Sequence, residues 1–534
     1  MSAFTVCNST ELETLIRTTP DGETCLLEPK EYYLTKQIII SNKNHITIDC
    51  NGAVFKTKYM NSEPSCASTD AILMKDCEHV TLKNLTLTTD TPVNVAATVE
   101  SFDEDELSFI IKVDDCYPMN GKEVFMGFDS MDADGSPDHQ FECYVRNPDS
   151  TVTTVVQKEI ICLSSHVGAA NEYLGENRFK IFLANLKYLQ NPVLKPGMRL
   201  CIRHTVYGPS AITLIDSNDT ILQDITMPAV PGFGITVLTR CHNLTIDGLR
   251  MPIIDRAHTL MACNCDGIHI VGLTGRLILQ NCLFDGLGDD ALNVHSAAGT
   301  VMEINTKKHL IKCNYCKKNP DGTLPKKWCL PGEILRFFDP ITQKVTATAI
   351  VTSFKDGILC YRNLSGEIWP GYMIQNTAFT PSCIISNCEV RNSRARGFLI
   401  QTENVEIKDC SFYGTSNSAV KAAPAFIKWH EVGPCHHLYV HNNTFVKCGF
   451  LSPEFPAVAI YTRHSGNDDA ITGLHSDIRI EENAFKQADG ICIGISSADN
   501  VTVSRNQFIE RQNTNYPAIQ IVSCTDVNIS NNEG

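Results

Sequence analysis

The stretch CDGIHIVGLTGRLILQNCLFDGLGDDALNVH, residues 265–295, decides the fold. It contains a small residue followed by an apolar-x-apolar run twice, as GIHI at Gly267 and as ALNV at Ala291, and a longer alternating run, LILQNCLF, starts between them at Leu277. Apolar residues at every second position over such short runs are typical of strands with one buried face. The two small residues are 24 positions apart, a repeat length that suits one turn of a parallel β-solenoid.

Both runs recur along the chain, and several neighbours are 22 to 33 residues apart. The short run recurs as AILM, GITV, GFLI, AVKA, AVAI, GICI and AIQI, at Ala71, Gly234, Gly397, Ala419, Ala457, Gly490 and Ala518. The longer run recurs as ITIDCNGAVF, VTLKNLTL, LTIDGLRM, CIISNCEV, VEIKDCSF, LYVHNNTF, IRIEENAF and VTVSRNQF, at Ile46, Val80, Leu244, Cys383, Val405, Leu438, Ile478 and Val501.

We therefore predict an all-β fold, a right-handed parallel β-helix with two short strands per repeat and Asn-rich corners. The opening segment STELETLIRTT has helical spacing and a Ser or Thr cap, and we expect it to shield the first coil. A sandwich or a propeller would instead show hairpin signals such as Asn-Gly at an even spacing of about 8 to 12 residues. Those signals are sparse in this chain.

Two intervals lack the repeat, from Ala71 to Ala211 and from Ala291 to Gly397. They contain longer strand-like runs such as LSFIIKV, FKIFLA, EILRFFD and KVTATAIVTSF, separated by Gly and Pro. We expect each interval to form a small antiparallel β-barrel-like domain that projects from the coils flanking the opening stretch. The expected order is a cap with the first coils (1–91), inserted domain 1 (92–205), the central coils (206–299), inserted domain 2 (300–380) and the C-terminal coils (381–534).

Length and charge restrict the class of partner. The 534 residues exceed what one compact core usually holds, which agrees with an elongated or multidomain architecture. A formal net charge of −15 argues against nucleic acid and anionic lipid, because both are bound by Lys and Arg that neutralise phosphates. It also disfavours strongly anionic polysaccharides, so neutral substrates fit best. The apolar runs are far shorter than the roughly 20 residues that cross a bilayer, so we expect no membrane span.

The 24 cysteines often lie inside alternating apolar runs, as in LILQNCLF and VEIKDCSF. Free Cys packs as a small buried hydrophobe, so we expect packed thiols in a reducing compartment instead of a disulfide framework. No secretory signal is visible at the N-terminus, which predicts a cytoplasmic protein, or a secreted one if a signal belongs in front of this chain. Cys313 and Cys316, with Cys329 downstream, could hold zinc, but no second pair completes four ligands and we predict no metal.

Carboxylates precede the small residue on neighbouring repeats. That position holds Asp266, then Asp290 and, beyond the second insertion, Arg396. Stacked coils are about 4.8 Å apart, so equivalent positions form a column. We therefore expect Asp266 and Asp290 to be near neighbours, with Asp289 beside them and Arg396 one coil away.

Polar residues extend this column into a patch. Strand alternation directs Asn293 and His295 outward, and His269 is the outward residue of the coil below. Such a cluster suits glycoside hydrolysis, in which one carboxylic acid protonates the departing oxygen while another carboxylate activates water. The two groups are roughly 6.5 to 9.5 Å apart in inverting enzymes and about 5 Å apart in retaining ones, and the sequence leaves both open.

A purely structural interpretation competes with the catalytic one. Asp70 and Asp489 occupy the same corner on other repeats, so an Asp there can be turn chemistry. Asp289 is harder to explain by a turn, because a second adjacent carboxylate adds repulsion. Arg394 and Arg396 could pair with the carboxylates or bind sugar hydroxyls.

Four segments together resemble glycoside hydrolase family 110, the inverting exo-α-1,3-galactosidases. They are CDGIHI, FDGLGDDALNVH, RARGFLIQT and the Trp-x-Glu-x-Gly element WHEVGP that leads into LYVHNNTF, and they lie mainly within residues 230–450. The pectin-degrading hydrolases of the same fold share the Asp one coil below an Asp-Asp pair. The resemblance implies a β-helix with inserted β-barrel domains that removes terminal α-1,3-linked galactose, as on blood-group-B or linear α-galactosyl glycans, with no metal or organic cofactor.

Site residues carry over from the resemblance. It implies that Asp266, Asp289 and Asp290 are catalytic, and the analogy with the pectin enzymes makes one of the adjacent pair the acid and the others the water-positioning base. The residues that we assign to substrate binding are His269, Asn293, His295, Arg394, Arg396, Trp429 and Glu431. Trp429 could stack on a sugar ring or pack against the solenoid wall.

Two other functions remain open at this point. One is another β-helix carbohydrate enzyme, such as a polygalacturonase-like hydrolase or a polysaccharide lyase. The other is a non-catalytic glycan-binding solenoid. The partner that we expect is a glycan with terminal α-galactose, and the sequence leaves a homodimer open.

Overall fold

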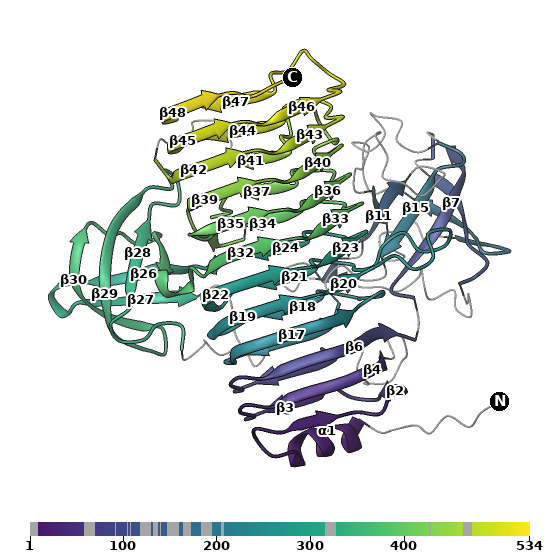
Figure 1. Ribbon diagram of the computed structural model, residues 1–534, viewed down its shortest axis with the longest axis horizontal. Coiled ribbons are helices and arrows are strands. Elements are labelled where there is room, and N and C mark those ends of the chain that lie inside the picture. The colour runs from purple at the N-terminus through teal and green to yellow at the C-terminus, as the bar shows by residue number, and fades with distance from the viewer. Residues whose placement is uncertain are drawn as a thin grey trace.

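The structure is a computed structural model of the chain (Figure 1). It describes residues 9–57, 70–90, 92–103, 105–106, 108–117, 130–131, 137–138, 140–146, 160–163, 172–182, 195–203, 208–315, 327–426, 429–462 and 473–534. Short strands stack coil upon coil from β3 near the N-terminus to β48 at the C-terminus, and helix α1 (Ser9–Thr18) lies across the first coil. The prediction of a parallel β-helix is confirmed, and so is the capping helix.

One wall of the solenoid is an eleven-stranded parallel sheet. Its strands are β3 (Ile38–Ser41), β5 (Ile72–Lys75), β16 (Ile212–Ile215), β18 (Ile235–Val237), β21 (Ile268–Ile270), β24 (Leu292–Val294), β34 (Phe398–Ile400), β37 (Val420–Ala422), β41 (Val458–Ile460), β44 (Ile493–Ser496) and β47 (Ile519–Val522). Nine of these strands directly follow the small residue of a short sequence run. The exceptions are β3, which follows Gln37, and β44, which follows Cys492, so Gly490 of the run GICI is not at the corresponding position.

The other walls form a continuous twenty-stranded sheet. Its strands are β1 (Thr24–Leu26), β2 (Glu31–Leu34), β4 (Thr47–Thr57), β6 (Thr81–Thr89), β17 (Asn218–Thr226), β19 (Cys241–Asp247), β20 (Arg250–Met251), β22 (Leu273–Gln280), β23 (Leu283–Asp285), β32 (Ser382–Ser386), β33 (Glu389–Arg391), β35 (Val405–Lys408), β36 (Ser411–Tyr413), β39 (His436–His441), β40 (Thr444–Val446), β42 (His475–Glu481), β43 (Ala484–Lys486), β45 (Ala498–Ser504), β46 (Gln507–Ile509) and β48 (Thr525–Ser530).

From β19 onward a coil has three strands, such as β22, β23 and β24, so the expectation of two strands per repeat is wrong for most coils; β4, β6 and β17 span the longer run as one strand. The longer sequence run is split because Asn281 adopts a left-handed conformation (φ 59°) between β22 and β23. Asn387 and Asn442 do the same on later coils (φ 51° and 55°). Asn tolerates this conformation better than most residues, which explains the Asn-rich corners.

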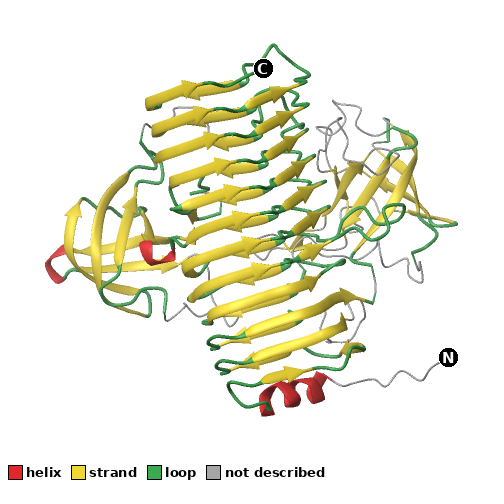
Figure 2. Cartoon of the chain, viewed as in Figure 1, coloured by secondary structure: helices red, strands yellow, loops and turns green. Residues whose placement is uncertain are grey.

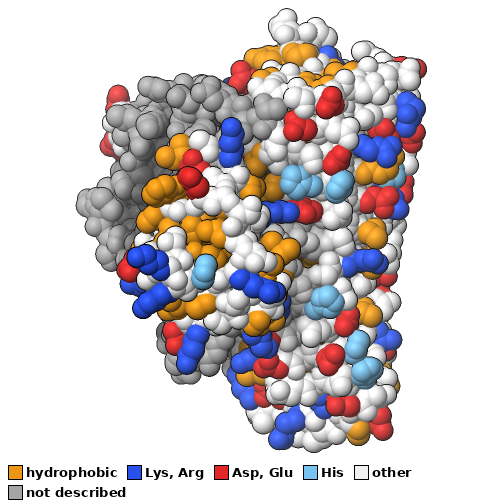
Figure 3. Space-filling view, turned by 90° about the vertical axis from the view of Figure 1, so that its left-hand side faces the viewer, with side chains coloured by type: hydrophobic (Ala, Val, Ile, Leu, Met, Phe, Trp, Pro, Cys, Tyr) orange, Lys and Arg blue, Asp and Glu red, His pale blue; other side chains and the backbone are white. Residues whose placement is uncertain are grey.

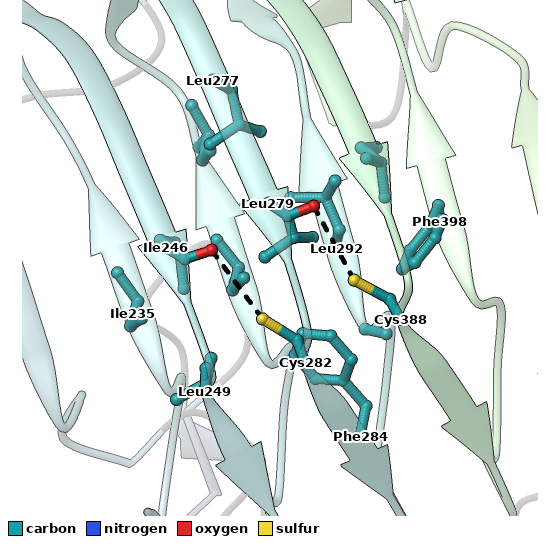
Figure 4. Packing of buried hydrophobic residues seen from close by; sticks show 14 of the residues in the cluster. Ile235, Ile246, Leu249, Leu277, Leu279, Cys282, Phe284, Leu292, Cys388 and Phe398 are labelled. Carbon is teal, nitrogen blue, oxygen red and sulfur yellow. Dashed lines mark hydrogen bonds between the residues drawn. The ribbon is translucent and has the colours of Figure 1, made fainter. Parts of the chain in front are cut away.

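The residue after this corner faces the solenoid interior. Cys282 and Cys388 occupy the position on two neighbouring coils and contact the carbonyl oxygens of Ile246 and Leu279 (Figure 4). Further along, the same position holds a ladder of asparagines: Asn443 donates to Asn483, which donates to Asn506, each at 3.0 Å. All 19 cysteines whose side chains the structure describes are free and 16 of them are buried, as the sequence pattern predicted.

We expect Asn483→Ala to lower the free energy of unfolding by about 2–3 kcal/mol, because Asn443 and Asn506 would each lose a buried hydrogen-bond partner. The midpoint of unfolding in guanidinium chloride, compared between the variant and the wild type, measures this loss. Asn528→Ala, on an exposed face of β48, is the matched control and should leave the midpoint unchanged. Equal midpoints for both variants would contradict a stabilising role of the ladder.

The two insertions leave the solenoid on opposite sides (Figure 1). The first is a seven-stranded antiparallel sheet of β7 (Asn94–Asp103), β8 (Ser108–Val113), β11 (Gln140–Arg146), β12 (Ile160–Leu163), β13 (Glu172–Gly175), β14 (Arg178–Phe182) and β15 (Arg199–Arg203), and a separate pair of β9 (Ser130–Met131) and β10 (Pro137–Asp138) lies within the same interval. The second is a closed barrel of β26 (Gly299–Asn305), β27 (Leu310–Tyr315), β28 (Ile334–Phe338), β29 (Val345–Lys355), β30 (Ile358–Gly366) and β31 (Met373–Asn376), with two short 3-10 turns, η4 (Thr306–Lys308) and η5 (Thr377–Phe379) (Figure 2).

Both insertions contact the solenoid through side chains. Asn94, at the start of β7, donates to Asn264 (3.0 Å) in the coil that carries the candidate site. From the barrel, Arg336 pairs with Glu403. Over the solenoid face drawn in Figure 3, acidic and basic side chains are intermixed instead of gathering by sign. Within the described residues, no helix has the length and apolar character needed to cross a membrane.

Candidate active site

Three neighbouring strands of the eleven-stranded sheet set the frame of the site. Ile268 of β21 pairs with Leu292 of β24, which pairs with Phe398 of β34. Asp266, Asp290 and Arg396 each lie two residues before these positions, so they form the column that the sequence spacing predicts.

The residue that follows each member of this column in the chain must be small, because successive coils pack closely there. A Cβ atom on Gly397 would lie only 2.2 Å from the carbonyl oxygen of Ala419 on the next coil. At Gly267 the corresponding distance, to the carbonyl oxygen of Ala291, would be 2.8 Å. The close approach of successive coils brings their acidic residues together as well.

Hydrogen bonds connect the members of the column. The backbone N–H of Asp290 donates to Oδ1 of Asp266 (3.1 Å). Arg396 donates from Nε to Oδ1 of Asp290 (2.5 Å) and from Nη2 to Oδ2 (2.6 Å), a bidentate pair. Asp289 lies 3.6 Å from Nη2 of Arg396, and one oxygen from each of the three aspartates lies within 4.8 Å of the others.

The three carboxylates differ in exposure. The side chain of Asp290 is 0% exposed and that of Asp266 is 6% exposed, whereas that of Asp289 is 30% exposed. Burial, reinforced by the negative charge of Asp289, raises the pKa of Asp266 well above its ordinary value. Burial also raises the pKa of Asp290, to about 7, although the Arg396 guanidinium opposes the shift. The cluster therefore retains a proton at pH values where isolated aspartates have lost theirs.

We expect Asp266→Asn to stabilise the protein by an amount that grows with pH. In the unfolded chain Asp titrates near pH 3.9, so at lower pH both states hold the proton and the charge has no effect. Above that pH the native state must keep its proton or bury a charge, and stability is lost until the pH passes the raised folded-state pKa. Asn avoids this cost and can still bond to His269 and to the N–H of Asp290.

The measurement is thermal unfolding of wild type and Asp266→Asn between pH 4.5 and 8. The stability difference should be small at pH 4.5 and on the order of 1–3 kcal/mol in favour of the variant at pH 8. A difference that does not change with pH would show that Asp266 titrates normally in the native protein.

A second group of polar side chains adjoins the aspartates. Nδ1 of His269 lies 2.7 Å from Oδ2 of Asp266, and Nε2 of the same ring lies 3.4 Å from Nε2 of His295. Oε1 of Glu431 lies 3.5 Å from Nε2 of His295 and accepts from Asn293 at the same distance. Gln401 donates to Oε2 of Glu431 (2.9 Å). His269, Asn293, His295 and Glu431 are thus brought together with the aspartates.

These side chains face away from the solenoid core, as expected, but they are not on the surface. Asn293 is 4% exposed and His295 is 1% exposed. The reason is a covering segment: β38 (Glu431–Val432) pairs antiparallel with β25 (Ser296–Ala297), directly after β24. Glu431 therefore reaches a coil that precedes it by more than 130 residues.

The remaining candidates lie at the border of the site. Nη2 of Arg394 is 4.0 Å from Oδ2 of Asp289, so both arginines face carboxylates. Trp429 is 38% exposed and lies in the turn before β38. It is close to the site along the chain, because Glu431 follows two residues later.

Gln401 was not among the sequence candidates. It follows β34 as His295 follows β24, and Ile400 pairs with Val294. The sequence repeat therefore predicts that Gln401 lies beside His295, but it does not predict the contact between Gln401 and Glu431.

Two groups of side chains could hold a cation in the described part of the chain: His269, His295 and Glu431, and the three aspartates. The Cys313 and Cys316 motif is not tested, because Cys316 lies outside the described residues; Cys313 and Cys329 are both buried.

The fold and the site define a class: a parallel β-helix with a cluster of acidic residues on consecutive coils. Residues 370–533 match the family described as the right handed beta helix region. Among solved structures, the chain is similar to the family 28 exopolygalacturonase of Yersinia enterocolitica, with a TM-score of 0.41 and 11% identity over 98% of this chain and 74% of that one.

The relatives that the chain is similar to in sequence are named alpha-1,3-galactosidases. The chain is 27% identical to alpha-1,3-galactosidase B of Bacteroides thetaiotaomicron, over 63% of this chain and 56% of that protein. It is 28% identical to alpha-1,3-galactosidase B of Akkermansia muciniphila, over 65% of this chain and 44% of that protein. The chain thus spans about half the length of these relatives. They bear out the resemblance to glycoside hydrolase family 110.

Proposed function

We propose that this protein is an exo-acting α-galactosidase that removes terminal α-1,3-linked galactose from glycans, such as blood-group-B or linear α-galactosyl chains, with inversion. The observation that carries the proposal is the aspartate cluster on the coils of Asp266 and Asp290, held by Arg396. The named activity of the relatives supports the same reaction.

The charge balance of the site favours a neutral sugar. Arg396 forms a bidentate pair with Asp290, and Arg394 lies 4.0 Å from Asp289, so both guanidiniums already face carboxylates of the cluster. Even with one proton held by the cluster, Asp266, Asp289, Asp290 and Glu431 carry three negative charges against two guanidiniums, so an anionic substrate would be repelled. This argues for galactose over galacturonate.

Hydroxyl groups of a sugar match the polar groups beyond the aspartates. The buried Oδ1 of Asn293 accepts no hydrogen bond from the residues that the structure describes. A buried acceptor of this kind is costly unless water or a ligand donates to it. A galactose hydroxyl would serve, which supports the assignment of Asn293 to substrate binding.

The exposures suggest how the roles divide. Asp289 is the one carboxylate of the three that is substantially exposed, so in our proposal it takes up the proton that the cluster retains and delivers it to the departing glycosidic oxygen. With the proton on Asp289, Asp266 and Asp290 are ionised; they are engaged by the Asp290 N–H, His269 and Arg396, and they position and deprotonate water. Carboxylates held in this way are poorly placed for direct attack on the anomeric carbon, and this favours inversion. The oxygen-to-oxygen distances within the cluster, at most 4.8 Å between one oxygen of each carboxylate, are nevertheless closer to the carboxyl separation of retaining enzymes.

A substrate panel tests the proposal. We expect release of free galactose from an α-1,3-galactosyl disaccharide and no release from its β-linked isomer. Polygalacturonate should yield neither reducing ends nor an unsaturated product that absorbs in the ultraviolet. Turnover of polygalacturonate instead of the galactoside would contradict the proposal, and so would sugar binding without turnover.

A further inference from the structure

A group of side chains beside the aspartates has a geometry that sugar binding does not require. His269 is on β21, His295 follows β24, and Glu431 is on β38. One ring nitrogen of each histidine and one carboxylate oxygen of Glu431 all lie within 4.8 Å of one another. The three residues come from separate parts of the chain and converge behind the covering segment.

We propose that His269, His295 and Glu431 form a binding site for a divalent transition metal, with Zn²⁺ as the best match. The distances carry this proposal. Tetrahedral zinc holds nitrogen and oxygen ligands at about 2.0–2.2 Å, which places neighbouring ligand atoms about 3.3–3.6 Å apart. The Nε2 atoms of His269 and His295 are 3.4 Å apart, and Nε2 of His295 is 3.5 Å from Oε1 of Glu431.

The surroundings of the ligands fit the same metal. Nδ1 of His269 faces Oδ2 of Asp266 at 2.7 Å, which leaves Nε2 as the nitrogen that can bind a cation. A carboxylate on the far nitrogen of a histidine ligand fixes the ring and its tautomer, as in many zinc sites. Gln401 donates to Oε2 of Glu431 and so orients the other oxygen, Oε1, toward His295.

The ligand set also selects against other cations. Two imidazoles and one carboxylate suit zinc and its neighbours, whereas Mg²⁺ and Ca²⁺ prefer oxygen ligands. Three protein ligands leave a fourth position of a tetrahedral metal open. Because Asp266 supports His269 directly, a metal here would lie next to the proposed catalytic cluster and occupy space that the sugar needs.

Calorimetric titration of the chelator-treated protein with ZnCl₂ tests the site directly. We expect saturable binding of one Zn²⁺ per chain and no comparable binding of Ca²⁺ or Mg²⁺. Glu431→Gln, which keeps the size of the side chain, and His295→Ala should abolish saturable binding. Asp266→Asn should weaken it by about 10- to 100-fold, the usual effect of losing a supporting carboxylate.

His437→Ala is the matched control, because this histidine also lies beside a carboxylate (Asp477, 3.3 Å) but is exposed on the outer wall. It should bind Zn²⁺ as the wild type does. Wild-type protein that binds no Zn²⁺, or Glu431→Gln protein that is folded and binds it unchanged, would overturn the proposal. Preferential Ca²⁺ binding would also overturn it, because it would place the cation on the aspartates.

The consequence for activity rests on the proposed function and is measured separately. We expect Zn²⁺ to inhibit galactoside hydrolysis and a chelator to restore it. If the protein binds Zn²⁺ but hydrolyses no galactoside, the proposed function fails and the metal site stands. If it hydrolyses the galactoside but binds no Zn²⁺, the metal site fails alone.

Discussion

Replacing Asp289 by Asn is expected to lower kcat for an α-1,3-galactosyl disaccharide by about 10³-fold or more while the protein stays folded. In our proposal this side chain delivers the proton to the departing oxygen, and general acid catalysis typically contributes 10²- to 10⁴-fold. Its partial exposure and long contacts to the arginines mean that the amide can replace the carboxylate without disrupting the coil.

The control is Asp489→Asn, the same substitution before a small residue (Gly490) on a distant coil; the register of β44 places Asp489 four residues before Ile493 and so outside the column. This variant should keep full activity. Near-normal kcat for Asp289→Asn, or an equal loss for Asp489→Asn, would contradict a catalytic role for the cluster. Thermal unfolding curves of both variants establish that any loss is not caused by unfolding.

The second large effect concerns the pair of Arg396 and Asp290. We expect Arg396→Met to lower the free energy of unfolding by about 2–4 kcal/mol, because it leaves the fully buried Asp290 carboxylate without its bidentate partner. The Arg396 side chain is itself 26% exposed, which places the expected value toward the low end of the range for buried pairs. Activity should fall too, since the proposed base is no longer held in place.

A double-mutant cycle tests the cause of this loss. Removing the charge as well, in Arg396→Met with Asp290→Asn, should recover at least half of the lost stability without recovering activity. If the double variant is less stable than the sum of the single effects predicts, the penalty does not come from an unpaired buried carboxylate. Chemical denaturation of the four proteins at pH 7.5 gives the comparison.

The repeat made much of the site predictable. Once Gly267, Ala291 and Gly397 are aligned, the parallel register of their strands places Asp266, Asp290 and Arg396 in one column, because each coil repeats the path of the coil below. The same reasoning directs Asn293 outward from its strand. Period and alternation suffice for these residues, since neighbouring coils determine their positions.

Other features depend on contacts that no local pattern encodes. The third strand of most coils arises from the left-handed conformation of residues such as Asn281, which composition suggests but does not locate. The covering segment pairs β38 with β25 after a long excursion of the chain, and the burial of His295 and the contact between Glu431 and Gln401 follow from that pairing. Sequence spacing indicates Glu431 as a candidate without indicating its neighbours.

The most direct test of the central claim is the NMR spectrum of an α-1,3-galactosyl disaccharide during the first minutes after the enzyme is added. We predict that galactose is released and that its β-anomer appears first, before mutarotation, with none formed by Asp289→Asn. Initial release of the α-anomer would contradict inversion. No release of galactose by the folded wild-type protein would contradict the proposed function itself.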